Sequence, residues 1–372
     1  MDLQGQNGLM GTHRESWRTR GPWAWVIGIG LMTFYCVLFF TPTMDGWAQA
    51  LGLRNRWFFY AALYSVAMIG GGVYYLRRHG NSRYNRVRIG VNIGVQVVLA
   101  FALPFVMGML GQPEVFLSYL WPLDINKLYP QTLESLPIYL AIYAVVASLV
   151  LAPLAAVLWG KRWYCSWVCG CGGLANTFGD PWRHLTSTST RSWRFELVAV
   201  HGMLGVAVIA TVAVILDAAI GDAHPWLRST VSGGLFHLPV IGSVSVKTSY
   251  AFFVGALLAG VFGTGLYPLL GPRVWCRNFC PMAAVMGLAQ KLGRFRIRVK
   301  PDMCISCGNC SAYCEMGIDV RAYAQRNESF TRASCVGCGM CAHVCPRGVL
   351  RLENGWRTQK DKHKQRLRVV DF

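Results

Sequence analysis

Eight cysteines near the C-terminal end of the chain fall into two runs with the same spacing. The first run is Cys304, Cys307, Cys310 and Cys314, and the second is Cys335, Cys338, Cys341 and Cys345. Each run has the pattern C-x2-C-x2-C-x3-C, in which three thiolates bind one 4Fe–4S cluster and the fourth binds the neighbouring cluster. The spacing therefore predicts two 4Fe–4S clusters with crossed ligation. One would be held by Cys304, Cys307, Cys310 and Cys345, and the other by Cys335, Cys338, Cys341 and Cys314.

Zinc sites and disulfides are the alternatives for such cysteine-rich runs. Zinc sites usually use two separated C-x2-C pairs, and disulfide frameworks are typical of small secreted proteins. Small residues such as Gly308 and Gly339 let backbone N–H groups point at sulfur. Pro346 follows the second run, whereas Glu315 stands at the equivalent position of the first. The segment resembles a bacterial two-cluster ferredoxin domain, which we expect at residues 291–352.

A second cysteine motif, Cys-x3-Cys, occurs twice before the ferredoxin-like segment. Cys165 and Cys169 correspond to Cys276 and Cys280 at a constant offset of 111 residues. On a helix, side chains at i and i+4 share a face, so each copy would present two thiols together. Four thiols from two neighbouring copies could form a third metal or redox site. Packing residues in tight turns and redox-active disulfides are the alternatives, but duplication of the motif favours a shared site.

Composition places most of the chain in a membrane. Of its 372 residues, 53% are hydrophobic and 14% are charged, with a mean hydropathy of +0.35. Six stretches are long enough to span a bilayer: about 22–41, 57–76, 87–110, 136–160, 195–220 and 248–270. We therefore expect an all-α integral membrane bundle at 22–290, with a parallel internal repeat, followed by an α+β two-cluster ferredoxin domain. Basic tails at 1–21 and 353–372 complete the chain.

The formal net charge of +19 could indicate nucleic acid binding. No nucleic-acid recognition module is visible, however, and the basic residues flank apolar spans, so lipid is the expected partner. The loops after the second and fourth spans are rich in arginine, which places them and both termini in the cytoplasm. The ferredoxin segment would then lie in a reducing compartment, where thiolate clusters are readily assembled.

Two ionisable residues, His201 and Asp217, lie within the fifth predicted span. On a helix they would be about 24 Å apart, so they cannot share one site. A lone histidine is more often a packing residue than a ligand, although ionisable groups inside a membrane are functional candidates.

The six spans, the duplicated Cys-x3-Cys motif and the terminal ferredoxin segment together resemble the NapH/NosR-type membrane-bound polyferredoxins, the membrane component of 4Fe–4S quinol dehydrogenases. This resemblance implies electron transfer between the quinone pool and a partner oxidoreductase at the bacterial inner membrane, with quinone as a further candidate cofactor. It places Cys165, Cys169, Cys276 and Cys280 at the family's Cys-x3-Cys positions. Gly170 and Cys171 stand where the family has a proline after the first motif, which leaves the role of Cys171 open.

Three hypotheses for function follow. The chain relays electrons as a subunit of a quinol-linked oxidoreductase, it handles copper as an assembly factor through the Cys-x3-Cys thiols, or it anchors a larger respiratory complex. Iron and sulfide beyond two clusters would distinguish the relay from the copper factor. Full electron flux in cluster-ligand variants would indicate the anchor.

Overall fold

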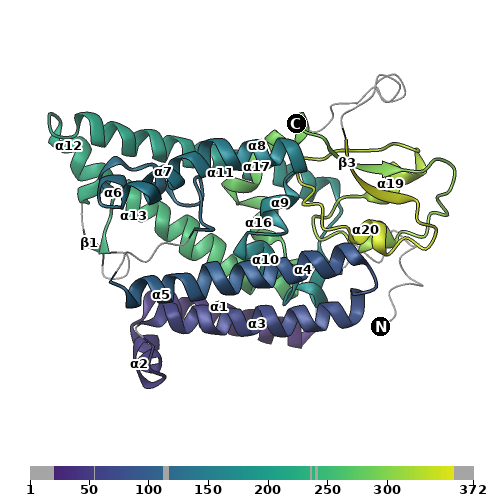
Figure 1. The fold of residues 1–372 in the computed structure, drawn as a ribbon, viewed down its shortest axis with the longest axis horizontal. Helices are drawn as coiled ribbons and strands as arrows, with labels where there is room; N and C mark the ends of the chain where they lie inside the picture. Colours follow the sequence, from purple (N-terminus) through teal and green to yellow (C-terminus); the bar gives the residue numbers. More distant parts are fainter. Residues whose placement is uncertain (1–20, 54, 112–116, 235–236, 239–241, 356–372) are drawn as a thin grey trace.

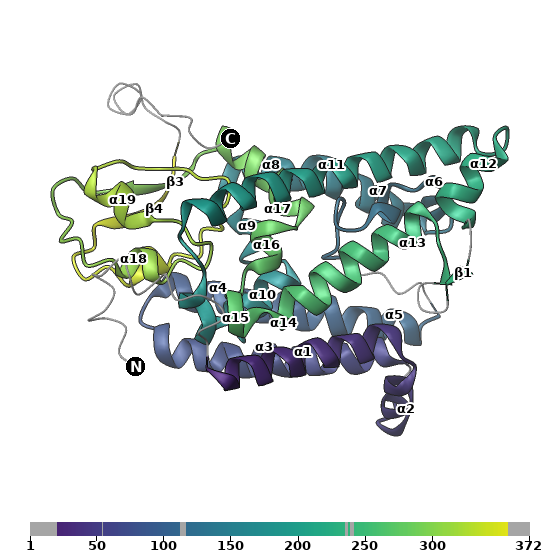
Figure 2. The ribbon, with the colours of Figure 1, turned by 180° about the vertical axis from the view of Figure 1, so that it is seen from behind.

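The computed structural model describes residues 21–53, 55–111, 117–234, 237–238 and 242–355 of the chain. The predicted basic tails lie almost entirely outside the described residues. Figure 1 shows long helices lying side by side, with the β3–β4 region at one end of the molecule. The same arrangement is seen from behind in Figure 2.

Six helical segments are long and apolar enough to cross a membrane, which confirms the predicted number of spans. They are α1 (Pro22–Phe40), α3 (Arg56–His79), α4 to α5 (Arg83–Met109), α7 to α8 (Ile138–Trp159), α11 (Thr190–Ile220) and α13 to α14 (Val246–Gly265). Many large apolar side chains on them are exposed, such as Val66, Val198 and Ile209. This outward-facing apolar surface is what lipid requires, so the fold is a multi-pass helical membrane bundle.

Two spans contain a proline in their interior, and each changes its helical geometry just before that proline. A π-helical segment, Val97–Ala102, joins α4 (Arg83–Gln96) to α5 (Leu103–Met109) and precedes Pro104. Another, Ala147–Leu151, joins α7 (Ile138–Val146) to α8 (Ala152–Trp159) and precedes Pro153. Proline lacks an N–H group and its ring collides with the carbonyl four residues earlier, so a widened turn keeps the helix continuous. The sixth span, from α13 (Val246–Tyr250) to α14 (Gly263–Gly265), is π-helical over Ala251–Phe262.

Glycines let α1 approach the sixth span closely. A Cβ at Gly28 would lie 3.1 Å from the carbonyl oxygen of Gly265, and a Cβ at Gly265 would overlap the side chain of Met32. Helices in lipid associate through such small residues, because apolar burial gives little driving force there.

The end of the bundle away from the ferredoxin region consists of short elements. They are α2 (Thr43–Ala50), a 3-10 turn at Ile125–Leu128, α6 (Pro130–Glu134), α12 (Pro225–Arg228) and the pair β1 (His237–Leu238) and β2 (Gly242–Ser243). Asp217 is fully buried here and accepts hydrogen bonds from Tyr129 Oη (3.1 Å) and Ser232 Oγ (2.5 Å). Asp217 therefore fastens the end of α11 to the loops.

The ferredoxin region is built on one antiparallel pair, β3 (Phe295–Val299) and β4 (Leu350–Asn354), with Phe295 opposite Asn354. Three short helices lie between the strands in sequence: α18 (Asn309–Ala312), α19 (Val320–Gln325) and α20 (Met340–His343). Phe295, Ile297 and Val299 on β3 are buried. The predicted α+β character of this region is confirmed.

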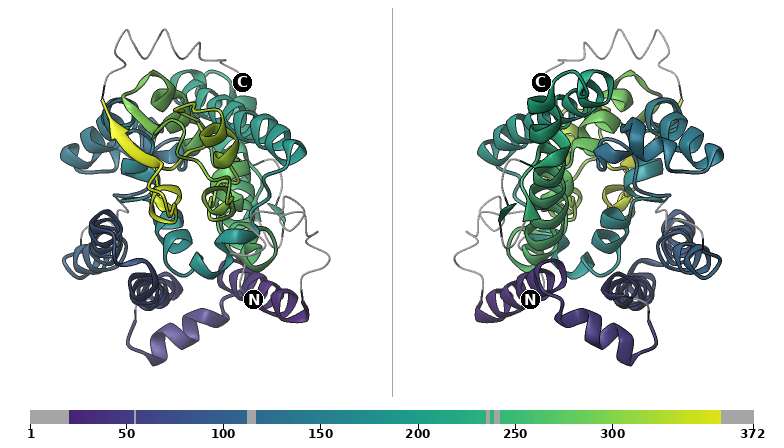
Figure 3. Two further views of the ribbon diagram at one scale, coloured as in Figure 1. Left: turned by 90° about the vertical axis from the view of Figure 1, so that its right-hand side faces the viewer. Right: turned by 90° about the vertical axis from the view of Figure 1, so that its left-hand side faces the viewer.

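Short helices carry the chain between the spans and the ferredoxin region. They are α9 (Arg162–Cys165), α10 (Gly170–Asn176), a 3-10 turn at Asp180–Leu185, α15 (Tyr267–Leu270), α16 (Val274–Asn278) and α17 (Pro281–Leu292). The end-on views of Figure 3 show how the long helices surround this set.

The membrane orientation can be tested with introduced cysteines. The turn between α3 and α4 lies at the ferredoxin end, and α6 lies at the opposite end (Figure 1). We expect Ser82→Cys to react with a membrane-impermeant maleimide only from the cytoplasmic side, and Gln131→Cys only from the outer side, because the arginine-rich turn stays inside. The parent protein provides the background labelling, and the reversed pattern would overturn the orientation.

Candidate functional site

The two cysteine runs of the ferredoxin region form equivalent loops. Gly308 and Gly339 have left-handed φ angles of 80° and 81° and stand at the start of α18 and α20. Residues with a Cβ rarely adopt this conformation, so glycine is needed there. The N–H of Ile318 donates to Cys314 Sγ at 3.4 Å, and the N–H of the equivalent Val349 donates to Cys345 Sγ at the same distance.

Cys345 lies with the first run rather than with its own. Cys304, Cys307, Cys310 and Cys345 line one small cavity. Burial, together with the nearby thiols of Cys307 and Cys345, raises the pKa of Cys310 to about 12. The four side chains are thus grouped as the crossed pattern predicts, and their role as ligands stays a prediction.

Cys314 correspondingly lies with the second run. Burial raises the pKa of Cys314 to about 12, and the thiols of Cys338 and Cys335 contribute. Burial also raises the pKa of Cys341, and the same three thiols add to the effect. This group, Cys314, Cys335, Cys338 and Cys341, is called the proximal set below, and the group with Cys345 is called the distal set.

The two Cys-x3-Cys motifs have the same backbone structure. Gly160 and Gly271 open them with φ angles of 80° and 94°. The N–H of Cys169 donates to Tyr164 O at 2.7 Å, and the N–H of Cys280 donates to Trp275 O at 3.0 Å. The duplication seen in the sequence is therefore also a structural repeat.

The expectation that each cysteine pair shares a helix face is wrong. Cys165 ends α9 and Cys276 lies in α16, but Cys169 and Cys280 have extended backbone and are the N-cap residues of α10 and α17. The first helix ends between the cysteines, and a second begins in a new direction. Pro281 at the first position of α17 favours such a restart.

The four cysteines of the two motifs nonetheless meet. All four are buried in one core. Burial raises the pKa of Cys280, and the thiols of Cys276, Cys169 and Cys165 raise it further. They are called the membrane-edge set below.

Cys171 is a fifth thiol beside this set. Its hydrogen bond to Cys169 lowers the pKa of Cys169 to about 7, against the effect of burial. The same bond, together with burial, raises the pKa of Cys171 itself. Cys171 therefore stabilises a thiolate at Cys169 when no metal is bound.

The arrangement of the thiols distinguishes classes of metal site. All fourteen cysteines of the chain are free, and none forms a disulfide. Within the described ranges, no three His, Cys, Asp or Glu side chains are placed to bind a single metal ion. Thiolates on one zinc ion lie within about 4 Å of each other, since Zn–S bonds are about 2.3 Å long, whereas thiolates on a cube each bind a different iron. Ligands of a cube therefore need not converge on one point, as the ligands of a mononuclear site must.

Buried cations lie beside the proximal and membrane-edge sets. Lys161, Arg88, Arg183 and Arg273 are at most 2% exposed. Burying a cation costs free energy unless a negative charge lies nearby to compensate it. Arg88 has two guanidinium nitrogens without a hydrogen-bond partner among the described residues. Clusters with four thiolate ligands are anionic, so this distribution of charge fits their presence.

Polar side chains from α3 and α4 hold the first Cys-x3-Cys motif in place. Tyr64 Oη donates to Gly170 O at 2.9 Å, and the amide of Gln96 donates to Val168 O. Tyr64 also donates to Gln96 Oε1 at 3.2 Å. These bonds satisfy carbonyl groups where the chain changes direction, and nothing in the sequence pattern singled out either residue.

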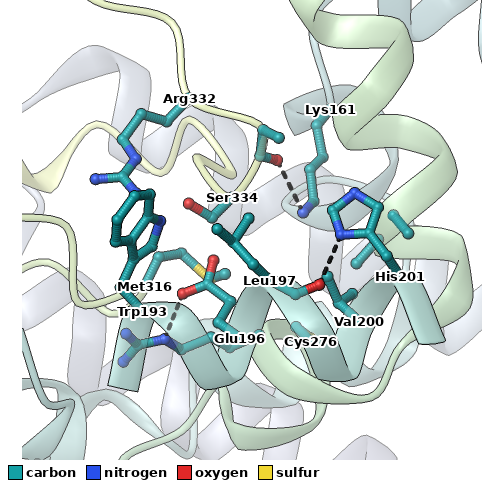
Figure 4. A pocket seen from close by; sticks show the side chains of 14 residues that line it. Lys161, Trp193, Glu196, Leu197, Val200, His201, Cys276, Met316, Arg332 and Ser334 are labelled. Atoms are coloured by element: carbon teal, nitrogen blue, oxygen red, sulfur yellow. Dashed lines mark hydrogen bonds and ion pairs between the residues drawn. The ribbon is translucent and has the colours of Figure 1, made fainter. Parts of the chain in front are cut away.

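A narrow pocket marks the seam between the ferredoxin region and the bundle (Figure 4). Lys161 Nζ donates to Ala333 O at 3.2 Å, and the Arg332 guanidinium lies 5.2 Å from the centre of the Trp193 ring. The loop that leads into the second cysteine run therefore rests on α9 and α11.

His201 lies at the rim of this pocket with an exposed ring (Figure 4). Its Nδ1 hydrogen bonds to Leu197 O at 2.8 Å, within the same helix. Neighbouring Glu196 forms an ion pair with Arg277 at 2.7 Å. His201 and Cys276 of the membrane-edge set line the same pocket, and α11 is one continuous helix from His201 to Asp217.

A large cavity of about 740 Å³ lies inside the bundle. Its walls come from α1, α3, α10 and the sixth span, and six tyrosines line it: Tyr35, Tyr60, Tyr64, Tyr119, Tyr250 and Tyr267. Cys171 and Cys276 also line it, so the cavity reaches the membrane-edge set.

Comparisons with known proteins agree with this geometry. The model of the 4Fe–4S dicluster domain matches residues 297–352, and the model of the 4Fe–4S binding domain matches twice, at residues 141–186 and 251–300. The chain is 26% identical over 180 residues to YccM of Escherichia coli (strain K12), whose name proposes a role in electron transport. The match covers 48% of this chain and 48% of YccM, so the chain spans about half the length of the curated relative it matches. No solved structure matches the chain.

These matches identify an iron–sulfur protein with ferredoxin domains in a multi-pass membrane chain. The two matches to the 4Fe–4S binding domain each contain one Cys-x3-Cys motif. A function in electron transfer follows from the ferredoxin domains.

Crossed ligation can be tested by pairing variants. We expect Cys345→Ser to lose the same EPR signal as Cys307→Ser in the reduced, purified protein, because both belong to the distal set. Cys314→Ser should match Cys338→Ser, which belongs to the proximal set. If Cys345→Ser instead gave the spectrum of Cys338→Ser, the assignment would be refuted.

Proposed function

We propose that this protein relays electrons one at a time between the quinone pool and a partner oxidoreductase, as a subunit of a quinol-linked enzyme. The observation that carries the proposal is the succession of sites along the molecule. The tyrosine-lined cavity reaches Cys276 of the membrane-edge set, and the ion pairs of Glu315 with Arg273 and Arg183 connect that set to Cys338 of the proximal set. The distal set lines a separate cavity bordered by exposed residues.

In this proposal each thiol set holds one 4Fe–4S cluster. Cys165, Cys169, Cys276 and Cys280 hold the first, and the proximal and distal sets hold the second and third. A bound cluster accepts and releases one electron at a time, at a potential that burial, charge and hydrogen bonds to sulfur set. Cys171 is not needed as a ligand, and its hydrogen bond to Cys169 helps to keep that thiol ionised for cluster assembly.

The distal set is the exit toward the partner. Ile305 is 55% exposed, and Ser306, Pro346 and Arg347 are also exposed around it. The cysteines of both ferredoxin sets are partly buried except for Cys310, so the exposed residues around the distal cavity mark this face. A redox partner that docks on this face comes close to the cluster, which favours transfer. We place this face in the cytoplasm, because the arginine-rich turns lie at the same end.

The large cavity is the proposed quinone site. Ligand cavities are typically about 300–1,000 Å³, mostly apolar, with a few polar groups. A quinone has an apolar ring and tail, and its two oxygens need hydrogen-bond donors. Tyrosine hydroxyls can supply these hydrogen-bond donors inside the bundle. Two of them, Tyr35 and Tyr60, already form a hydrogen bond with each other, with their oxygens 3.2 Å apart. Oxidation of a quinol releases two electrons and two protons, and a cluster held by the adjacent membrane-edge set would accept the electrons one at a time.

The same picture supports membership of the NapH/NosR-type polyferredoxins, with a membrane domain at 22–290 and a ferredoxin domain at 291–352. A copper-handling factor has less support, since the thiols are not grouped as ligands of a single ion among the described residues.

Iron content distinguishes relay from copper factor. We expect the anaerobically purified protein to contain about twelve iron and twelve sulfide per chain, since three cubes are held. Cys276→Ala with Cys280→Ala should lower this to about eight, because only the ferredoxin clusters remain. Stoichiometric copper, or an unchanged iron content in the double variant, would count against a membrane-edge cluster.

A bulky side chain in the cavity tests the quinone site. Gly255 lines the cavity, and a Cβ there meets no atom within 4 Å, so Gly255→Trp should fill the space without displacing the backbone. We expect at least a tenfold slower reduction of the clusters by a short-chain quinol, with dithionite reduction and iron content unchanged.

The matched control is Gly205→Trp on α11. Gly205 is also exposed and also meets nothing within 4 Å, but it does not line the cavity. Equal rates for the two variants would show that quinol reaches the clusters by another route.

A further inference from the structure

Glu315 follows the first cysteine run directly, yet its side chain is fully buried at the junction between the ferredoxin region and the bundle. The equivalent residue of the second run, Pro346, is exposed. The two cysteine loops otherwise have the same geometry, with Gly308 and Gly339 in matching conformations. The cysteine loop itself therefore does not require a buried acid at this position. The contacts of the Glu315 side chain must explain why it is there.

Glu315 lies between two buried arginines from different parts of the membrane domain. Its Oε2 is 3.0 Å from Arg183 Nη1, and its Oε1 is 3.0 Å from Arg273 Nη2. The side chains of both arginines are at most 2% exposed. The two guanidinium groups compensate the negative charge of the buried carboxylate, which would otherwise be costly to bury.

Each arginine also contacts a cysteine of a different thiol set. Arg183 Nη1 donates to Cys338 Sγ of the proximal set at 3.7 Å, and Arg273 Nη1 donates to Cys276 Sγ of the membrane-edge set at the same distance. The result is one unbroken buried chain of contacts: Cys338, Arg183, Glu315, Arg273 and Cys276.

Other contacts hold Arg273 in this position. Its Nη2 also donates to Asn176 Oδ1 at 3.0 Å, and its Nη1 donates to Cys165 O at 3.3 Å. Arg183 is held by Asp180 at 3.0 Å. The guanidinium groups are thus fixed in a geometry that serves both the carboxylate and the sulfurs.

We propose that Glu315 is a positioning residue that couples the proximal and membrane-edge clusters: it fixes Arg183 and Arg273 beside their sulfurs, and its negative charge offsets theirs, which keeps the reduction potentials of both clusters low. The proposal rests on clusters at both thiol sets, and it goes beyond the electron relay by naming the residue that joins them. The test below uses neither the quinone nor the redox partner of the proposed relay.

The direction of the effect follows from charge. A reduced cluster carries one more negative charge than an oxidised one, so a nearby cation stabilises the reduced form and a nearby anion destabilises it. Inside the protein the local dielectric is low, and a fully buried charge acts strongly over short distances. Loss of the Glu315 charge leaves two guanidinium groups uncompensated, one beside each cluster, so both potentials should rise.

The experiment is a redox titration of the purified, cluster-loaded protein, followed by EPR. Signals are assigned with the Cys338→Ser and Cys280→Ser proteins. For Glu315→Gln we expect the ratio of reduced to oxidised cluster at a fixed potential to rise about tenfold at both sites, which is about 59 mV for a one-electron couple. The potential of the distal cluster should change much less, because the series of contacts from Cys338 to Cys276 includes no cysteine of the distal set.

Glu328→Gln is the matched control. Glu328 belongs to the same domain and also pairs with an arginine, Arg326 at 3.0 Å, but both side chains are at least half exposed. Its loss should leave all potentials unchanged, since water screens an exposed charge. Glu315→Asp keeps the negative charge, so the potentials of both clusters should lie closer to those of the parent protein than to those of Glu315→Gln.

Two further variants apply if Glu315→Gln does not assemble its clusters. Arg183→Lys should lower the potential of the proximal cluster alone, and Arg273→Lys that of the membrane-edge cluster alone, because each loses one guanidinium contact to sulfur. Potentials in Glu315→Gln equal to those in Glu328→Gln would overturn the proposal. A rise confined to one cluster, or arginine variants that shift neither, would overturn it as well.

Discussion

Burial of several thiolates at the edge of a membrane is the constraint on which this structure depends. Each thiolate loses hydration, and a cluster that binds four of them remains negatively charged, so cations must lie close by. The chain supplies Lys161, Arg88, Arg183 and Arg273 within its interior. Removal of one partner from such a buried network typically costs about 3–5 kcal/mol, because the remaining charge is left uncompensated. The cations therefore belong to the cofactor sites as much as the cysteines do.

This requirement also explains why the ferredoxin region is fixed to the bundle. Ser166 Oγ donates to Val336 O and Tyr84 Oη donates to Gly337 O, each at 2.7 Å. The buried side chain of Gln290 donates to Cys335 O at 3.0 Å. All these bonds end on the loop that carries the proximal set. If the ferredoxin region moved away from the bundle, the buried charges would become exposed. The hydrogen bonds and the buried charges therefore both favour a ferredoxin region that stays packed on the bundle.

Sequence periodicity and cysteine spacing predicted the six spans and the α+β ferredoxin region, because apolar length and ligand spacing are local properties. The turn of each Cys-x3-Cys motif was predicted wrongly. Spacing of i and i+4 indicates a shared helix face, but Gly160 and Gly271 start short helices that end before Cys169 and Cys280. The role of Glu315 could not be predicted either, since its two arginines are 132 and 42 positions away in sequence. Its one signal was a charged residue where the other run has Pro346.

Fixed contacts have a consequence for how electrons move. In a carrier with a mobile domain, the rate depends on the motion between donor and acceptor. Here the proximal and membrane-edge sets are joined by ion pairs of 3.0 Å at Glu315, and the backbone N–H of Arg294 donates to Val157 O at 3.0 Å where the last span region leads into β3. The distance between these two sets is therefore a property of the fold. In the proposed relay, only the approach of a quinone at one end and of a partner at the other would need diffusion. In that relay, a rigid junction would make the potentials of the clusters held by these sets, rather than domain motion, the quantity that decides how readily electrons pass.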